Sequence, residues 1–163
     1  MNPAERRWPL PFLGPIARAR VLAASIPSAA WTEGVLDAPY DTAWPWIADL
    51  ETSVPTFDTQ VRRVRVGARW PEDGAQRLRL TASTLGVPVR FDVRLEDGYC
   101  LMQARARLYL VVMAAEPHDG GERTRFLHLE AVPLRGARPL RRHLQRVVAE
   151  DFSNLSRLAA GGF

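Results

Sequence analysis

Phe126, His128 and Glu130 alternate along a segment of β-forming residues, and two of them carry groups that can transfer a proton. Alternate residues of a strand point to the same face of its sheet, so these three side chains share one face. An imidazole beside a carboxylate can act as an acid or a base on a carbonyl or enol group of a ligand. The hydroxyl of Tyr109 could orient the same ligand by one hydrogen bond. The candidate catalytic residues are therefore His128, Glu130 and Tyr109.

The direction in which this strand face points decides between a catalytic and a surface position. If His128 and Glu130 point inward, the imidazole and the carboxylate line the interior. In the other register Leu127, Leu129 and Ala131 fill the interior, and the polar pair is a solvated contact of little energetic weight. We expect the second register, in which a His128→Ala substitution leaves ligand binding nearly unchanged.

No other pattern in the sequence indicates a catalytic or cofactor site. A nucleophile elbow, a phosphate-binding loop, a dinucleotide fingerprint and zinc-ligand spacing are all absent from it. The three histidines, His118, His128 and His143, are expected in a turn, a strand and a helix, which is too dispersed for a metal site. Cys100 is the only cysteine, which excludes an intrachain disulfide and a cysteine-rich metal site. We therefore expect neither a metal nor a cofactor.

Length and composition are typical of one globular domain. A chain of 163 residues buries about 70% of the surface that its unfolded form exposes, enough for a core that contains a cavity. The net charge of +4 comes from scattered arginines without a single lysine, so we expect no nucleic-acid partner. No run of apolar residues is long enough to span a membrane, and a lone cysteine suits a reducing cytoplasm, where we expect the protein.

The longest helical pattern covers residues 138–160. Its apolar residues recur at spacings of three and four, the period of one helix face. They are Leu140, Leu144, Val147, Val148, Phe152, Leu155 and Leu158. The opposite face is polar, so we expect an amphipathic helix of about 33 Å, long enough to cross a small sheet.

Before this helix, the spacing of apolar residues indicates a sheet. We expect a first strand over residues 31–37, short helices over 42–50 and 51–57, and then about six antiparallel strands. The strands are predicted over residues 60–68, 76–83, 87–95, 99–105, 109–115 and 123–132, with turns at 71–74, 97–98 and 117–121 and a bend between 105 and 108. Because one sheet face is apolar and the other arginine-rich, we expect the C-terminal helix alone to cover the apolar face. The residues expected to face one another are Leu144, Val148 and Phe152 on the helix and Leu80, Phe91 and Val93 on the strands.

Residues 1–30 are expected to form an N-terminal arm, and residues 31–163 a single domain. A short amphipathic helix is predicted from Pro15 to Ile26, with proline in its first turn and Pro27 after its end. This helix could be a lid across a binding mouth or make peripheral contact with a membrane surface. We expect instead a packing helix or a loosely held arm.

Two stretches give the sequence a family resemblance. Residues 37–49, DAPYDTAWPWIAD, are similar to the passage from first strand to helix in the START-like, or SRPBCC, superfamily. Residues 119–125, DGGERTR, resemble the Gly-Gly-Thr-Arg turn of that superfamily with Glu-Arg inserted. Together with the order of elements, the resemblance covers about residues 31–160. The superfamily includes polyketide cyclases, dehydrases and lipid-transfer proteins. The resemblance implies an α+β helix-grip fold, in which a curved antiparallel sheet wraps around the long C-terminal helix and leaves a deep apolar cavity between them.

This resemblance implies a class of ligand rather than a reaction. We expect the cavity to bind a hydrophobic small molecule such as a lipid, an isoprenoid or a polyketide. The residues expected to line it are Phe57, Val64, Leu78, Leu80, Phe91, Val93, Met102, Leu144, Val148 and Phe152. One alternative is a cyclase or dehydratase that acts on the bound chain through His128, Glu130 or Tyr109. Another is a regulatory or chaperone-like partner protein that binds no ligand.

Overall fold

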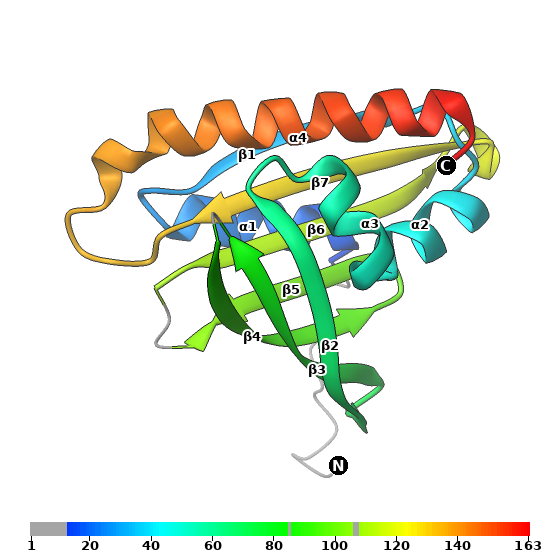
Figure 1. Cartoon of the computed structure of the whole chain (residues 1–163). Helices are drawn as coiled ribbons and strands as arrows, with labels where there is room; N and C mark the ends of the chain where they lie inside the picture. The colour runs from blue at the N-terminus through cyan, green and yellow to red at the C-terminus, as the bar shows by residue number, and fades with distance from the viewer. Residues whose placement is uncertain (1–12, 85, 106–107) are drawn as a thin grey trace, which may run out of the picture.

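The computed structural model describes residues 13–84, 86–105 and 108–163, and its centre is a seven-stranded antiparallel sheet (Figure 1). The strand order is β1-β7-β6-β5-β4-β3-β2, so β1 and β2 form the two edges. The strands are β1 (Ala30–Leu36), β2 (Val61–Glu72), β3 (Ala75–Thr84), β4 (Val87–Glu96), β5 (Tyr99–Ala104), β6 (Leu110–His118) and β7 (Arg123–Ala131). The helices are α1 (Pro15–Ser25), α2 (Tyr40–Ala48), α3 (Leu50–Phe57) and α4 (Arg141–Gly161), with short 3₁₀ turns η3 (Asp119–Gly121) and η4 (Arg138–Leu140).

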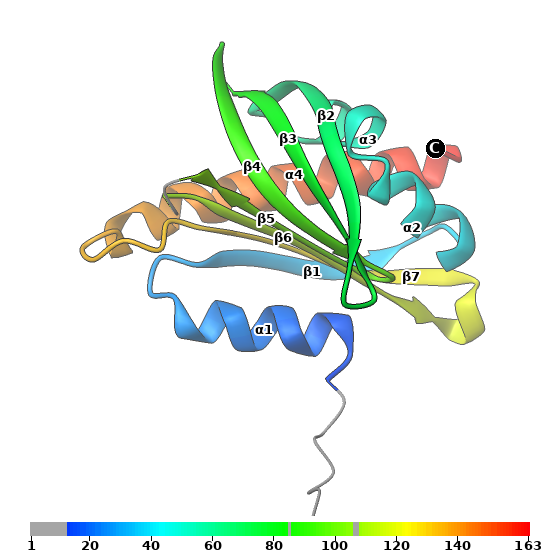
Figure 2. The same ribbon diagram turned by 90° about the horizontal axis from the view of Figure 1, so that it is seen from below.

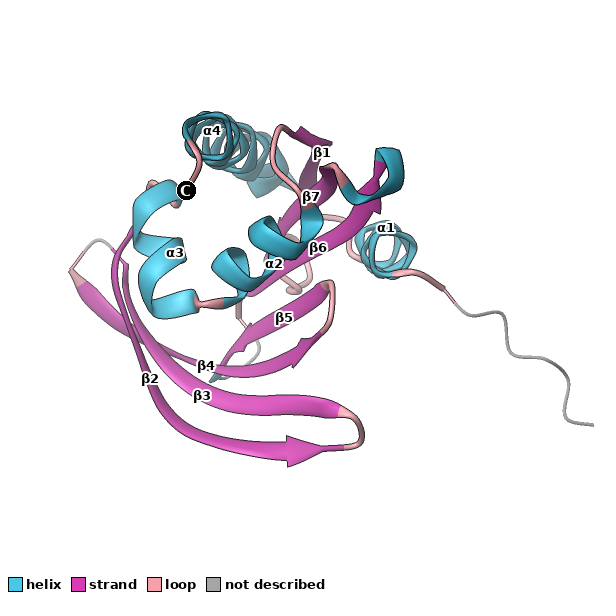
Figure 3. Cartoon of the chain, turned by 90° about the vertical axis from the view of Figure 1, so that its right-hand side faces the viewer, coloured by secondary structure: helices cyan, strands magenta, loops and turns pink. Residues whose placement is uncertain are grey.

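This architecture confirms the predicted α+β helix-grip fold. The sheet is strongly curved, and α2, α3 and α4 lie on its concave side (Figure 3). The predicted bend between residues 105 and 108 includes residues 106–107, which lie outside the described residues. None of the described helices has both the length and the apolar character needed to cross a membrane.

Two predicted turns are shorter than expected: β6 continues through Pro117 and His118, which were predicted as part of a turn, and the turn over 71–74 is reduced to two residues. Pro71 and Glu72 belong to β2, and the turn consists of Asp73 and Gly74 alone, with φ angles of 48° and 75°. Two central residues with positive φ are typical of a hairpin turn whose twist matches that of the strands. Pro71 is tolerated inside β2 because β2 is an edge strand. The backbone N–H that proline lacks is therefore not required for a hydrogen bond to a further strand.

Both faces of the sheet are covered along β5, β6 and β7. Helix α1 lies against the convex face (Figure 2), and a second apolar core joins it to these strands. Its buried members include Ile16, Ala19 and Ala23 of α1 and Val112, Ala114, Leu127, Leu129 and Ala131 of β6 and β7. The expectation of one covered face is therefore wrong for this half of the sheet, because α1 supplies a second cover. The arginine-rich convex face of β2–β4 does remain exposed.

Polar contacts near the start of α1 attach this helix to the sheet. The backbone N–H of Ile16 donates to Oε1 of Glu116 at 3.0 Å. The guanidinium of Arg18 pairs with Glu96 at 2.7 Å and lies 4.0 Å from the centroid of the Tyr99 ring. These residues identify α1 as a packing helix, on the opposite side of the sheet from the concave core.

The long helix α4 lies along the β1–β7 edge rather than over the middle of the sheet (Figures 1 and 3). Leu144 and Val148 form a small cluster with Ala30, and the ring of Phe152 joins the main core. Leu144, Val148 and Phe152 were expected to face Leu80, Phe91 and Val93, which is wrong for Leu144 and Val148. Phe152 lies against Gly34 of β1 and Phe126 of β7. The curvature of the sheet carries β3 and β4 away from α4, and α3 occupies the intervening space.

Candidate functional site

A pocket of about 200 Å³ lies in the concave face of the sheet, between α3 and strands β2–β7. Most of its lining is aliphatic or aromatic, and its polar groups include the carboxyl groups of Asp58 and Glu130 and the hydroxyl of Tyr109. The lining residues are Val54, Asp58, Gln60, Val61, Val64, Leu80, Ala82, Thr84, Val89, Phe91, Met102, Tyr109, Val111 and Glu130. Strands whose inward side chains alternate with outward ones build the apolar walls.

The structure brings together only part of the predicted lining. Val64, Leu80, Phe91 and Met102 line this pocket, each from a different strand. The other predicted lining residues lie elsewhere: Phe57, Leu78 and Val93 in the main core, Leu144 and Val148 beside β1, and Phe152 over β1. The pocket therefore lies under α3 rather than α4, because α4 follows the edge of the sheet.

The predicted register of β7 is wrong. Phe126, His128 and Glu130 point to the concave side, and the solvent-accessible fractions of His128 and Glu130 are only 1% and 2%. Leu127 and Leu129 are also buried, on the convex side against α1. Because both faces of β7 are covered, a strand face that carries polar residues does not have to be the solvated one.

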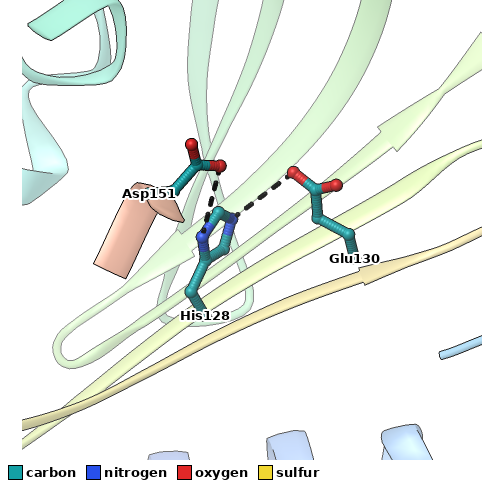
Figure 4. A group of neighbouring side chains, drawn as sticks. All are labelled: His128, Glu130 and Asp151. Atoms are coloured by element: carbon teal, nitrogen blue, oxygen red, sulfur yellow. Dashed lines mark ion pairs between the residues drawn. The ribbon is translucent and has the colours of Figure 1, made fainter. Parts of the chain in front are cut away.

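Three buried polar side chains meet between β7 and α4 (Figure 4). The imidazole of His128 lies between the carboxyl groups of Glu130 and Asp151, with Nε2 3.8 Å from Oε1 of Glu130 and Nδ1 3.9 Å from Oδ2 of Asp151. Both distances exceed hydrogen-bond length. Neither Nδ1 of His128 nor Oδ2 of Asp151 has a hydrogen-bond partner within the described part of the chain.

Each carboxyl group is held by a donor on its other oxygen. The hydroxyl of Tyr109 donates to Oε2 of Glu130. The backbone N–H of Thr59 donates to Oδ1 of Asp151 at 2.9 Å. These donors orient the remaining oxygens, Oε1 and Oδ2, toward the imidazole. Glu130 belongs both to this group, which we name the polar cluster (His128, Glu130 and Asp151), and to the wall of the pocket.

No family model matches the sequence, and no curated protein matches it. Solved structures match the fold. Zhui, an aromatase/cyclase from Streptomyces sp. R1128, is 17% identical, with a TM-score of 0.57 over 83% of this chain and 98% of its own. An 18 kDa protein from Caulobacter crescentus is 13% identical, with a TM-score of 0.64 over 82% of this chain and 96% of its own. The di-domain ARO/CYC StfQ of the steffimycin biosynthetic pathway is 16% identical, with a TM-score of 0.54; the match covers 90% of this chain and 53% of that one.

The chain shares the helix-grip fold of these structures. This confirms the resemblance seen in the sequence at the level of architecture. Identities of 13–17% show a common fold. The chemistry of the site depends on its own residues.

The buried position of His128 and Glu130 keeps both side chains largely uncharged. Burial raises the pKa of Glu130 to about 8 and that of Asp151 to about 7, and the neighbouring carboxyl of Asp58 adds to both shifts. Burial lowers the pKa of His128 to about 4. Near neutral pH the imidazole is therefore neutral and Glu130 mostly protonated, so their contact is not an ion pair even though 3.8 Å is within ion-pair range.

Asp151 and Asp58 also belong to this interior and were not predicted from the sequence. Asp151 lies three residues after Val148 and four before Leu155, so the helical period places it in the middle of the apolar face of α4. A carboxyl group on the apolar face of a helix was the sequence signal that could have identified Asp151 as an interior residue. Asp58 directly follows α3, and no pattern in the sequence marks it as a pocket residue.

Proposed function

We propose that the protein binds a small, predominantly apolar molecule in the pocket under α3. The observation that carries this proposal is the lining: aliphatic and aromatic side chains form most of the walls, and the few polar groups include the hydrogen-bonded pair of Tyr109 and Glu130. Ligand sites typically combine an apolar wall with a small number of polar groups that fix orientation. Burial of apolar ligand surface, at about 25 cal/mol per Å², would supply most of the affinity.

The polar groups restrict how the ligand is oriented. Glu130 and Tyr109, which are hydrogen-bonded to each other, face the pocket together with Asp58. A ligand with one hydroxyl or carbonyl group would place it against them and leave its apolar part against Val64, Leu80 and Phe91.

The pocket volume limits the size of the ligand. About 200 Å³ is below the range of roughly 300–1,000 Å³ typical of ligand sites, so a long lipid, isoprenoid or polyketide would need side chains to move apart. Two solved structures with this fold are aromatase/cyclases, which supports a polyketide-like ligand among these classes.

A matched pair of substitutions on β3 tests this proposal. Ala82→Phe fills the pocket, whereas Thr81→Phe adds the same ring to the next residue, on the opposite face of the strand. We expect Nile red, a neutral apolar dye, to bind the wild type and Thr81→Phe with one site, and to bind Ala82→Phe at least tenfold more weakly. Circular dichroism would verify that both variants fold. Solvent extraction and mass spectrometry of the purified wild type would identify a co-purified ligand.

Equal dye binding by both variants would contradict the proposed pocket. A wild type that binds no dye and carries no extractable molecule would favour the alternative of a partner protein that acts without a ligand.

A second candidate function is catalysis of a cyclisation or dehydration on the bound molecule. It is favoured by the hydrogen-bonded pair of Tyr109 and Glu130 in an otherwise apolar wall, where a positioned proton donor and acceptor are most effective. With a poly-β-ketone thioester as substrate, Glu130→Gln and Tyr109→Phe would abolish turnover and retain Nile red binding. Unchanged turnover in both variants would leave binding as the function.

A further inference from the structure

We propose that His128, Glu130 and Asp151 bind one divalent first-row transition-metal ion between β7 and α4. This inference concerns the polar cluster and goes beyond binding of an apolar molecule in the pocket. The three side chains are at most 2% exposed, and one candidate ligand atom from each lies within 4.8 Å of the other two.

Two polar atoms of the cluster have no hydrogen-bond partner among the described residues. Nδ1 of His128 and Oδ2 of Asp151 are buried, lack a hydrogen bond within the described residues, and lie 3.9 Å apart (Figure 4). Leaving a buried polar atom unpaired costs about 1–3 kcal/mol, and such atoms often mark a bound water or ion. An ion about 2.0–2.2 Å from each atom spans a separation of up to about 4.4 Å, so this gap is too long for a hydrogen bond and suitable for an ion.

The surroundings of the carboxyl groups match those of metal-binding carboxylates. Such ligands use one oxygen for the ion, and outer hydrogen bonds hold them in place. Tyr109 holds Oε2 of Glu130, and the backbone N–H of Thr59 holds Oδ1 of Asp151. Oε1 and Oδ2 remain free, and a single ion would take both of them together with one imidazole nitrogen, because one ligand atom of each residue lies within 4.8 Å of the other two.

Charge also favours a dication. No described arginine lies within ion-pair distance of Glu130 or Asp151. Two buried carboxylates without a cation are strongly disfavoured, and a divalent ion would neutralise both. One imidazole with two carboxylates suits Zn²⁺, Mn²⁺, Fe²⁺ or Co²⁺, whereas Ca²⁺ and Mg²⁺ prefer oxygen ligands alone.

The test uses the untagged full-length protein after treatment with EDTA. Titration with ZnCl₂ and CoCl₂ should give one ion per chain by calorimetry and by elemental analysis after gel filtration, together with a higher melting temperature. His128→Gln and Asp151→Asn should each weaken binding by at least 100-fold. Tyr109→Phe removes an outer hydrogen bond and should weaken it about 10–100-fold.

His118→Gln is the matched control, because His118 also lies beside a carboxylate, 3.5 Å from Asp119, but on the surface. This variant should bind the ion like the wild type. In the wild type itself, ¹⁵N NMR of the histidines should show a large shift of the His128 ring nitrogens on addition of Zn²⁺, a readout that does not depend on whether a variant folds.

The proposal is overturned if the wild type retains no ion, if His128→Gln and Asp151→Asn retain it as the wild type does, or if Zn²⁺ leaves the His128 resonances in place. In these cases a water molecule would be the occupant of the gap. Ala82→Phe should block Nile red and leave metal binding intact, so the two proposals fail independently.

Discussion

Tyr109 donates a hydrogen bond to the carboxyl group of Glu130 inside an apolar interior, and burial raises the pKa of that carboxyl to about 8 from an ordinary value of 4.5. Between these two pH values the folded protein holds a proton that the unfolded chain has released. The contribution of Glu130 to the free energy of unfolding of the metal-free protein should therefore fall as pH rises from 4.5 to about 8, by up to about 1.4 kcal/mol per pH unit. His128, whose pKa is lowered from 6.5 to about 4, opposes this fall below pH 6.5.

Glu130→Gln should remove this loss, because the amide keeps a hydrogen-bond acceptor for Tyr109 and cannot ionise. Urea unfolding at several pH values in the presence of EDTA should show a shallower pH dependence for the variant and a higher stability at pH 8. Asp151, with its pKa raised to about 7, supplies a remaining slope in both proteins. If the free energy of unfolding of Glu130→Gln depended on pH as steeply as that of the wild type, Glu130 would already be ionised at neutral pH.

Cys100 provides a chemical probe of the same interior. Its side chain is fully buried, and burial raises the pKa of the thiol to about 12. Only the thiolate reacts with disulfide reagents, so Ellman's reagent at pH 8 should label the native protein only through opening of the sheet. We expect one thiol per chain to react at once in guanidinium chloride and to react slowly without it. Rapid complete labelling of the native protein would show that β5 is accessible.

The packing of α1 on the convex face makes this helix a stabilising part of the fold. Ile16 is 2% exposed, whereas Val21 of the same helix is 59% exposed. Ile16→Ala should lower the free energy of unfolding by about 2–5 kcal/mol, and Val21→Ala by less than about 0.5 kcal/mol. Urea unfolding measures both. Equal small losses would indicate a loosely held arm.

Gly34 allows α4 to approach β1 closely. A Cβ atom built at Gly34 would lie 2.5 Å from Cζ of Phe152, far inside contact distance. Gly34→Ala should therefore destabilise the protein by about 1–3 kcal/mol, and Phe152→Leu in the same chain should recover part of that loss. Gly67→Ala is the control, since its nearest neighbour would be the Arg79 carbonyl oxygen at 3.5 Å. If the double variant lost as much free energy of unfolding as the two single variants lose together, the result would argue against this contact.

The order and type of the elements could be predicted from the sequence, because they depend on local spacing. The repeat of three and four from Leu144 to Leu155 defines a helix whatever it packs against, and the alternation from Val87 to Leu95 defines a strand. The hairpin at Asp97–Gly98 likewise depends on a few adjacent residues. These signals, with the family resemblance, were sufficient for the helix-grip fold.

The candidate site depended on contacts between distant residues. Alternation along β7 separates Phe126, His128 and Glu130 from Leu127 and Leu129, but it does not say which set is buried. Both sets are buried because α1, about a hundred residues earlier in the chain, covers the convex face. A strand pattern contains no information about a second cover contributed by another segment.

The position of the pocket and the polar cluster was decided by tertiary structure for the same reason. Spacing places Asp151 on the apolar face of α4, but only the docking of α4 along the β1–β7 edge brings its carboxyl group to His128. The curvature of the sheet then separates α4 from β3 and β4, so the pocket forms under α3. Sheet curvature and helix docking minimise exposed apolar area over the whole molecule, and no local segment of the sequence specifies them.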